Sequence, residues 1–183
     1  MRITPDLLKQ NKPKLNAIHQ IELSLRNKKI TEINGLEYLN DSIDYLDLSN
    51  NNIKILDNFP KMSRLKHLNV SNNKIERIGD DLYKRIPNLV SLNIANNQIS
   101  DSAQLINISK FEKLKNLILI GNTVAYKSYC INNIASLDML DFSKIRKNLS
   151  PIGIKKLKIC DLKEKINSVK SLEELDKLEK YIK

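Results

Sequence analysis

The sequence is poor in the residues that build catalytic sites and disulfide frameworks. Its 183 residues include two cysteines, four glycines, two histidines and no tryptophan. Cys130 and Cys160 form no CxxC pair, and they do not flank the two ends of the chain as the stapling cysteines of secreted repeat proteins commonly do. The cysteine pattern therefore indicates a reducing compartment, the cytosol or the nucleus.

The scarcity of glycine and histidine also removes the usual sites for phosphate and metal. No GxxxxGK[ST] or GxGxxG motif is present to cradle phosphate, and no HExxH motif or Cys/His cluster is present to bind metal. His67 has no cysteine or second histidine near it in the pattern, so it is better explained as a surface contact than as a general base. We expect no enzyme, no cofactor, no metal and no small-molecule substrate.

Long apolar runs are missing as well. The opening residues, MRITPDLLKQNKPK, contain no signal-peptide core, and no stretch approaches the roughly 18 apolar residues of a membrane span. We therefore expect no signal peptide, no membrane span and no membrane partner. A chain of 183 residues that is 41% hydrophobic can bury one sizeable core, as a single domain does.

Acidic residues are outnumbered at the two ends of the chain. The formal net charge is +10, from 31 Lys and Arg against 21 Asp and Glu. Residues 1–30 carry seven basic and two acidic side chains, residues 144–183 carry twelve and six, and the region between is nearly balanced. Without interleaved aromatic residues, such an excess favours contact with nucleic-acid backbones rather than with bases, and it is a weak signal alone.

The sequence does contain an internal repeat. LDLSNNNI at 46–53, LNVSNNKI at 68–75 and LNIANNQI at 92–99 follow the form LxxLxLxxNxL, which is typical of leucine-rich repeats. The second apolar residue of each LxL defines a register of Leu25, Leu48, Val70, Ile94, Leu119 and Phe142, spaced by 22 to 25 residues. One repeat cannot bury its own apolar face, so we predict an α/β solenoid, a horseshoe of stacked repeats with a parallel sheet on its concave side.

The repeats need a cover at each end. Thr4 followed by Pro5 predicts the start of a short helix that covers the first repeat. The segment 129–145 keeps the strand phrase Leu137, Leu140 and Phe142 but has no following asparagine, as expected of a terminating repeat. We predict about five repeats and a cap over residues 1–147.

A basic and then helical tail is predicted over residues 148–183. Two capping boxes, Asp161 with Glu164 and Ser171 with Glu174, favour helices in this segment. The second helix either lies exposed on the cap or binds a partner, and its sequence fits both readings.

The repeated asparagines are predicted to belong to the frame. Three residues after each reference position, an inward carboxamide can bond backbone groups that the turn leaves unpaired, and each unpaired buried group costs about 1 to 3 kcal/mol. This structural ladder consists of Asn51, Asn73, Asn97 and Asn122. Lys28 takes the position in the first repeat, which has a neighbour on one side only.

Side chains that alternate with the buried pair of each strand are predicted to point out of the concave face. They are Glu22, Ser24, Arg26, Tyr45, Asp47, Ser49, His67, Asn69, Ser71, Ser91, Asn93, Ala95, Asn116, Ile118 and Ile120, with Met139, Asp141 and Ser143 in the last strand. The face is polar in its middle and apolar at its end. This mixture suits a protein partner better than a small molecule, although a solvated face without a partner has the same pattern.

Two basic groups flank this face and are candidates for contact with RNA phosphates. They are Arg26, Lys28 and Lys29 at the first strand, and Lys144, Arg146 and Lys147 after the last strand.

The segments TPDLLKQ, IELSLRNKKI, LDNFP and LDFSKI, in this order and spacing, resemble the A-prime family of U2 small nuclear ribonucleoprotein (U2 snRNP) subunits. The resemblance covers roughly residues 1–147 and implies a nuclear, non-catalytic protein of pre-mRNA splicing. In that family the concave sheet holds a helix of an RNA-recognition-motif (RRM) protein, B-double-prime, and the pair binds a stem-loop of U2 snRNA. The resemblance puts Arg26 where partner and RNA approach each other.

The chain departs from that family around Asn122. Gly121 and Thr123 stand where the family typically has an arginine and a proline, and the tail from Ser150 onward has no match. The repeats alone also fit a regulatory scaffold of a phosphatase or motor complex that uses the same concave face, and this alternative stays open.

Overall fold

Each repeat begins with a short strand whose central leucine is buried. The computed structural model describes residues 1–39 and 41–145. In it, β3 (Tyr45–Asp47), β5 (His67–Asn69), β7 (Ser91–Asn93) and β8 (Asn116–Ile118) lie side by side and parallel. Their register aligns Leu46, Leu68, Leu92 and Leu117, each at most 2% exposed. The predicted parallel sheet is confirmed.

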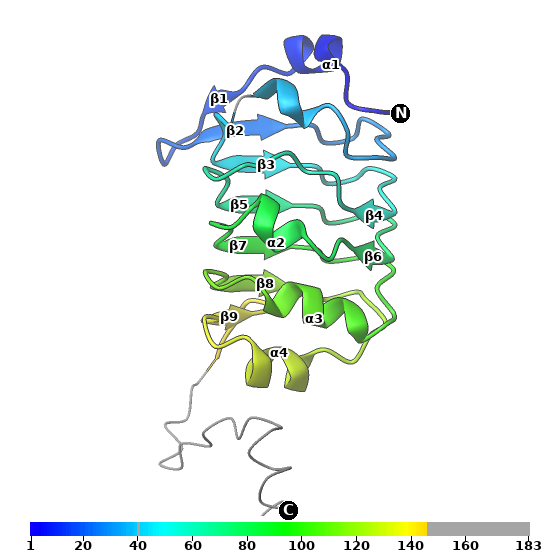
Figure 1. Ribbon diagram of the computed structural model, residues 1–183, viewed down its shortest axis with the longest axis vertical. Helices are drawn as coiled ribbons and strands as arrows, with labels where there is room; N and C mark the ends of the chain where they lie inside the picture. Colours follow the sequence, from blue (N-terminus) through cyan, green and yellow to red (C-terminus); the bar gives the residue numbers. More distant parts are fainter. Residues whose placement is uncertain (40, 146–183) are drawn as a thin grey trace, which may run out of the picture. The chain divides into compact units, whose positions relative to one another are not determined.

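An antiparallel hairpin closes the large sheet at each edge (Figure 1). At the first edge β1 (Lys14–Leu15) pairs with β2 (Ile21–Ser24), and at the other edge β9 (Met139–Leu140) pairs with β10 (Ser143–Lys144). The order of the eight strands is β1-β2-β3-β5-β7-β8-β9-β10.

The return half of each repeat carries the remaining elements. These are η1, a 3-10 helix (Leu36–Leu39), the strands β4 (Ile55–Leu56) and β6 (Arg77–Ile78), and the helices α2 (Leu82–Arg85), α3 (Ala103–Ser109) and α4 (Lys127–Asn133). The strands β4 and β6 pair in a separate two-stranded parallel sheet. In Figure 1 they lie across their repeats from β3 and β5.

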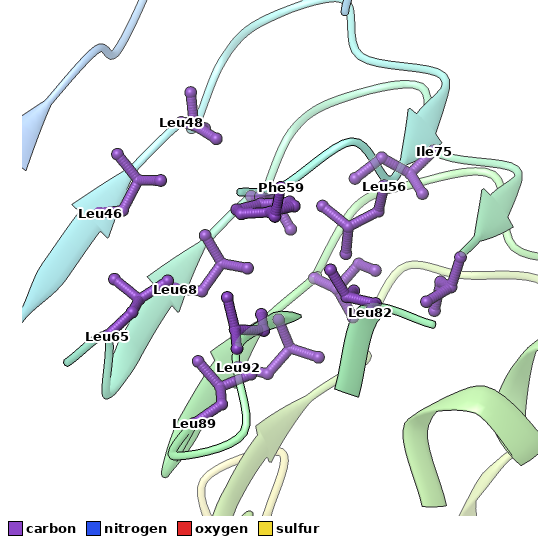
Figure 2. Packing of buried hydrophobic residues seen from close by; sticks show 14 of the residues in the cluster. Leu46, Leu48, Leu56, Phe59, Leu65, Leu68, Ile75, Leu82, Leu89 and Leu92 are labelled. Carbon is purple, nitrogen blue, oxygen red and sulfur yellow. The ribbon is translucent and has the colours of Figure 1, made fainter. Parts of the chain in front are cut away.

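The core fills the space between the large sheet and the return segments. Figure 2 shows Leu46, Leu68 and Leu92 of the strands directed toward Leu56 and Leu82 of the return halves. All five are at most 2% exposed. Full burial of one such side chain stabilises a fold by about 1.5 to 3 kcal/mol, so stacking the repeats is what makes each repeat stable.

The N-terminal cover has the predicted form. Helix α1 (Pro5–Gln10) begins after Thr4, whose hydroxyl accepts a hydrogen bond from the Leu7 amide at 3.2 Å. Leu7 and Leu8 are 6% and 8% exposed and lie in the core cluster. The helix therefore shields the edge of the first repeat from water.

The last repeat departs from the predicted register. Leu137 and Leu140 are buried as predicted, but Phe142, predicted as the final core position, is 72% exposed. Asp141 and Phe142 have φ values of +48° and +66°, so the chain turns into β10 instead of continuing the strand. No further repeat follows within residues 1–39 and 41–145, so a buried residue at position 142 would have no neighbour there, and the strand reverses.

Several predicted features lie outside the described residues: Arg146, Lys147, the domain boundary after residue 147 and the tail 148–183 with its two capping boxes. Within the described ranges, no helix is long and apolar enough to cross a lipid bilayer.

Candidate interaction surface

The chain leaves the sheet through the same turn in each repeat. The position two residues after the reference residue of each repeat has a positive φ. It is occupied by Asn27, Asn50, Asn72 and Asn96, with φ between +52° and +59°, and by Gly121, with φ of +79°. Asparagine and glycine enter this left-handed region most readily. The first asparagine of each NN pair, and Gly121 in the fifth repeat, are therefore turn residues.

The second asparagine of each pair joins neighbouring repeats. Asn51 donates from Nδ2 to the carbonyls of Leu25 (3.0 Å) and Leu48 (2.8 Å), and its Oδ1 accepts from the amides of Lys28 (2.9 Å) and Ile30 (3.0 Å). The same pattern of donation to two repeats and acceptance from the preceding one recurs at Asn73, Asn97 and Asn122. These carboxamides belong to the frame.

A second row of amides lies on the surface beside this buried ladder. Asn96 Nδ2 donates to Asn72 Oδ1 at 2.9 Å, and the amide end of Asn50 lies 3.1 Å from that of Asn72. With the Asn50 oxygen turned toward Arg26, it accepts from Nε at 2.7 Å and Nη2 at 3.0 Å. A Cβ at position 121 would lie 2.1 Å from Asn96 Oδ1, which accounts for Gly121 at the end of the row.

The outer face of the large sheet, hereafter the open sheet face, carries most of the predicted contact residues. Ser24, Arg26 and Ile120 are exposed; Glu22, Tyr45, Asp47, His67, Asn69, Ser91, Asn93, Asn116 and Ile118 are half-buried. Ser49, Ser71 and Ala95 are only 2%, 8% and 7% exposed, so the prediction that they point outward is wrong. They follow the reference residue in repeats two to four, whereas Arg26 and Ile120, at the same position in the first and fifth repeats, are exposed.

Three residues of the open sheet face also stabilise the turn that follows their strand, because their side chains accept hydrogen bonds from its backbone amides. Asp47 Oδ1 accepts from the Ser49 amide at 2.8 Å, and Asn69 and Asn93 accept in the same way from the amides two residues later, each at 3.1 Å. Contact surface and frame are therefore combined in these side chains.

Tyr45 and His67 form the aromatic centre of the face. Their rings stack with centroids 6.0 Å apart and planes 28° apart, and His67 Nε2 lies 3.1 Å from Gln20 Nε2. Burial, followed by the charges of Asp47 and Glu22, raises the pKa of Tyr45. Burial, followed by the charge of Lys66, lowers the pKa of His67 below 6.5, so the ring is neutral at neutral pH.

An ion pair that sequence reasoning missed supports this centre. Asp44, 5% exposed, accepts from Arg64 Nε (3.0 Å) and Nη2 (3.2 Å) and from the Ile21 amide (3.0 Å). The Arg64 hydrogen bond, and then that of Ile21, lower the pKa of Asp44 below its ordinary value of 3.8. The carboxylate thus ties β2 to the third repeat. Asp44 directly precedes a strand, but it does not fall on the contact positions of the repeat.

The end of the face near β9 is apolar. Ile120, two residues after the half-buried Ile118, is 51% exposed, Met139 on the neighbouring strand β9 is 40% exposed, and Phe142 in the turn that follows β9 is 72% exposed. Exposed apolar groups of this size at one place are typical of a binding surface. Phe142 belongs to this set only because the last strand reverses.

The opposite end of the face is basic. A pocket of about 530 Å³ beside β1 and β2 is lined by Lys12, Lys14, Arg26 and Lys28, with Glu22 as its acidic member. Lys12 and Lys14 were not among the residues predicted to contact RNA. The excess of basic residues in 1–30 was the feature that could have indicated them. Lys29 does not line the pocket, and Lys144 lies in β10 at the other edge of the sheet.

Within the described residues, no group of three or more His, Cys, Asp or Glu side chains could hold a metal ion. Cys130 is a buried free thiol, and burial, followed by the charge of Asp141, raises its pKa to about 12. A thiol of this kind is a poor nucleophile.

A family profile described as leucine-rich repeat matches residues 1–158. The chain is 36% identical over 150 residues to U2 small nuclear ribonucleoprotein A′ of Mycosarcoma maydis, covering 80% of this chain and 61% of that protein. It is 38% identical over 152 residues to the Schizosaccharomyces pombe protein of the same name, covering 81% and 64%, and 35% identical over 150 residues to the Homo sapiens protein, covering 80% and 59%.

The chain therefore spans about three fifths of the length of these curated relatives. Among solved structures, it is similar to the crystal structure of the Drosophila melanogaster SNF/U2A′ complex. The TM-score is 0.77 at 30% identity, with 98% of this chain and 99% of that chain covered.

Proposed function

The chain belongs to the leucine-rich repeat family, and from this premise we propose that it is a non-catalytic subunit of the U2 snRNP that acts in pre-mRNA splicing in the nucleus. The observation that carries the proposal is the open sheet face, basic at one end and apolar at the other, in a chain whose curated relatives are U2 A′ proteins. A solved relative was crystallised as an SNF/U2A′ complex, which supports a protein partner for the same fold.

The partner proposed for this face is an RRM protein of the B-double-prime kind, which presents a helix to the sheet. Side chains that alternate along short parallel strands form rows across which an amphipathic helix can lie. Tyr45 and His67 offer a rigid aromatic centre, and Ile120, Met139 and Phe142 offer apolar anchors. Aromatic and apolar anchors of this kind carry most of the affinity of protein interfaces.

The basic pocket is proposed to contact phosphates of a U2 snRNA stem-loop held mainly by the RRM partner. Lys12, Lys14, Arg26 and Lys28 line one pocket, and a cluster of cations without interleaved aromatic rings suits the sugar-phosphate backbone. With its amide oxygen turned toward Arg26, Asn50 accepts two hydrogen bonds from the guanidinium, which reduces the entropy lost when Arg26 binds. The chain alone is therefore expected to bind RNA weakly and the pair to bind it tightly.

A pull-down with and without ribonuclease tests the proposal. The tagged chain should recover an RRM protein in both samples, and U2 snRNA only in the sample without ribonuclease. Recovery of a phosphatase or motor subunit without U2 snRNA would support the scaffold alternative, and absence of any RRM protein would refute the proposed function.

A further inference from the structure

The small sheet on the return side has two different edges. At its β6 edge, the backbone of Ile78 is capped by side chains of α3. The Ile78 amide donates to Gln104 Oε1 at 2.8 Å, and the Ile78 carbonyl accepts from Asn107 Nδ2 at 3.0 Å. Capping by side-chain amides prevents another chain from pairing at this edge.

The β4 edge carries no such cap. The carbonyls of Lys54 and Leu56 accept from Glu76 (2.9 Å) and Gly79 (3.0 Å), so these residues direct their backbone groups to the β6 side. Because backbone groups alternate in direction along a strand, the N–H and C=O of Ile55 face away from β6. No group in the described part of the chain bonds them, and the Ile55 side chain is 42% exposed.

A groove of about 810 Å³ is lined by the return segments of the first three repeats and includes Ile55 of β4. Residues 31–33 of the first repeat line it together with Lys54, Ile55, Lys74 and Arg77. In Figure 1 the strand β4 lies across its repeat from β3, so the groove is separate from the open sheet face. An occupant could be held there while another partner covers that face.

The groove has a surplus of positive charge. Lys54, Lys74 and Arg77 are exposed, and none of them makes an ion pair within the described ranges. Of the two acidic residues that line the groove, Glu32 is paired with Arg2 at 3.0 Å, whereas Asp57 keeps its charge, so three cations stand against one carboxylate outside an ion pair. The charge therefore favours an anionic occupant.

We propose that this groove binds an extended acidic segment of a partner protein, which adds a strand to β4. The backbone of Ile55 supplies one donor and one acceptor for the added strand, the Ile55 side chain contacts an apolar residue of the segment, and the three cations contact its carboxylates. No aromatic side chain lines the groove to stack on bases, so a peptide fits it better than RNA. This site lies beyond the proposed snRNP function and is independent of it.

A fluorescence polarisation titration tests the proposal. The probe is a labelled peptide of about eight residues that alternates Val and Glu, and a Val/Lys peptide is its charge-inverted control. The protein should bind the acidic probe and not the basic one. The variant K54E/K74E/R77E should weaken binding at least about tenfold, as expected when close charge pairs become repulsive, whereas K61E/K115E/K127E, with the same charge change elsewhere, should bind like the wild type.

Two variants of one residue test the strand pairing. Ile55→Pro removes only the N–H that faces the groove, and an edge strand accepts proline at such a position. It should bind the probe about tenfold more weakly than Ile55→Val, which keeps the N–H. Urea unfolding of each variant checks that the fold is kept, and in the wild type the NMR amide signal of Ile55 should shift and exchange more slowly with probe bound.

The proposal is overturned if the wild type does not bind the acidic probe, if both peptides bind alike, or if Ile55→Pro and Ile55→Val bind equally. An unchanged Ile55 amide with probe bound also overturns it. Binding of single-stranded RNA that is lost in K54E/K74E/R77E, without binding of the acidic peptide, would assign the groove to nucleic acid instead.

Discussion

At the scale of single residues, two adjacent asparagines in one phrase do different work. Asn50 supplies a left-handed turn and a half-buried amide beside Arg26, whereas Asn51 is 6% exposed and bonds backbone groups of its own repeat and of the preceding one. The difference follows from the turn, which directs one carboxamide outward and the next one inward. Substitutions of the two kinds should therefore differ in their effect on stability.

Asn73→Ala is expected to lower the free energy of unfolding by about 2 to 4 kcal/mol, because the Ile53 amide and the carbonyls of Leu48 and Val70 lose a partner inside the core. Urea unfolding measures the change. Asn72→Gly is the matched control, since it keeps the left-handed φ and removes an exposed amide whose hydrogen bond with Asn96 lies on the surface. Equal losses in both variants would contradict the assignment of the inner asparagine to the frame.

The lowered pKa of Asp44 predicts an acid-sensitive contribution to stability. A carboxyl group whose folded pKa lies below its ordinary value of 3.8 stabilises the fold above that pH, and the contribution is lost as pH falls through the folded pKa. The stability difference between the wild type and Asp44→Asn should therefore shrink between about pH 5 and pH 2. Asp81→Asn, an exposed pair with Lys84, is the control and should show little change. A difference that is constant with pH would contradict the role of the ionised carboxylate.

At the scale of elements, the two ends of the solenoid are closed by different means. The first repeat is covered by α1, and the last is closed by the β9–β10 turn, in which Asp141 takes part. Asp141 Oδ1 accepts from the amides of Leu119 (2.8 Å) and Ile120 (3.1 Å), and Oδ2 accepts from the Tyr126 hydroxyl. One carboxylate thus accepts hydrogen bonds from the amides of the preceding strand end, as backbone carbonyls of the next repeat do elsewhere in the sheet.

Asp141→Ala is expected to loosen the last hairpin and to destabilise the fold by about 1 to 3 kcal/mol, because two amides and a phenol lose their acceptor. Hydrogen exchange should quicken most at Leu119 and Ile120, and urea unfolding gives the global effect. Ser143→Ala, an exposed change in the same hairpin, should leave both unchanged. Unaltered exchange at Leu119 in Asp141→Ala would show that the carboxylate does not close the end.

At the scale of the whole molecule, the open sheet face runs from a basic end to an apolar end. Lys14 lies in β1 and Lys12 just before it, whereas Phe142 lies in the turn after β9. The change from basic to apolar side chains therefore follows the order of the strands in the sheet. Such a gradient fixes the orientation of a partner that is itself charged at one end and apolar at the other. The two ends can be tested separately.

Phe142→Asn is expected to weaken binding of the RRM partner about tenfold, a loss of about 1.4 kcal/mol, while the unfolding free energy stays the same or rises. The side chain is exposed, and asparagine tolerates the φ of +66° better than phenylalanine does. Isothermal titration calorimetry with the purified partner measures the affinity. Ile131→Asn, an equally apolar exposed change on α4, is the control, and similar losses in both variants would argue against a specific contact.

Lys12→Gln with Lys14→Gln is expected to reduce the salt dependence of RNA binding by the protein pair. The log–log slope of affinity against salt should fall by about one unit for each phosphate that the variant no longer neutralises. The slope is obtained from titrations at several salt concentrations. Lys113→Gln with Lys127→Gln removes the same charge outside the pocket and should leave the slope as it is. An unchanged slope in the pocket variant would contradict phosphate binding by these two lysines.

The sequence by itself determined the repeat, its register from Leu25 to Leu119, the inner asparagine positions and the N-terminal cover. These features depend on spacing and on local backbone chemistry, which recur every 22 to 25 residues and can be read from one copy to the next. Only the tertiary structure decided the burial of Ser49 and Ser71, the exposure of Phe142, the Asp44–Arg64 pair and the convergence of Lys12 and Lys14 on Arg26. The reason is physical: each of these depends on what packs against a residue from another repeat or on how the described sheet ends, and a periodic pattern carries no information about either.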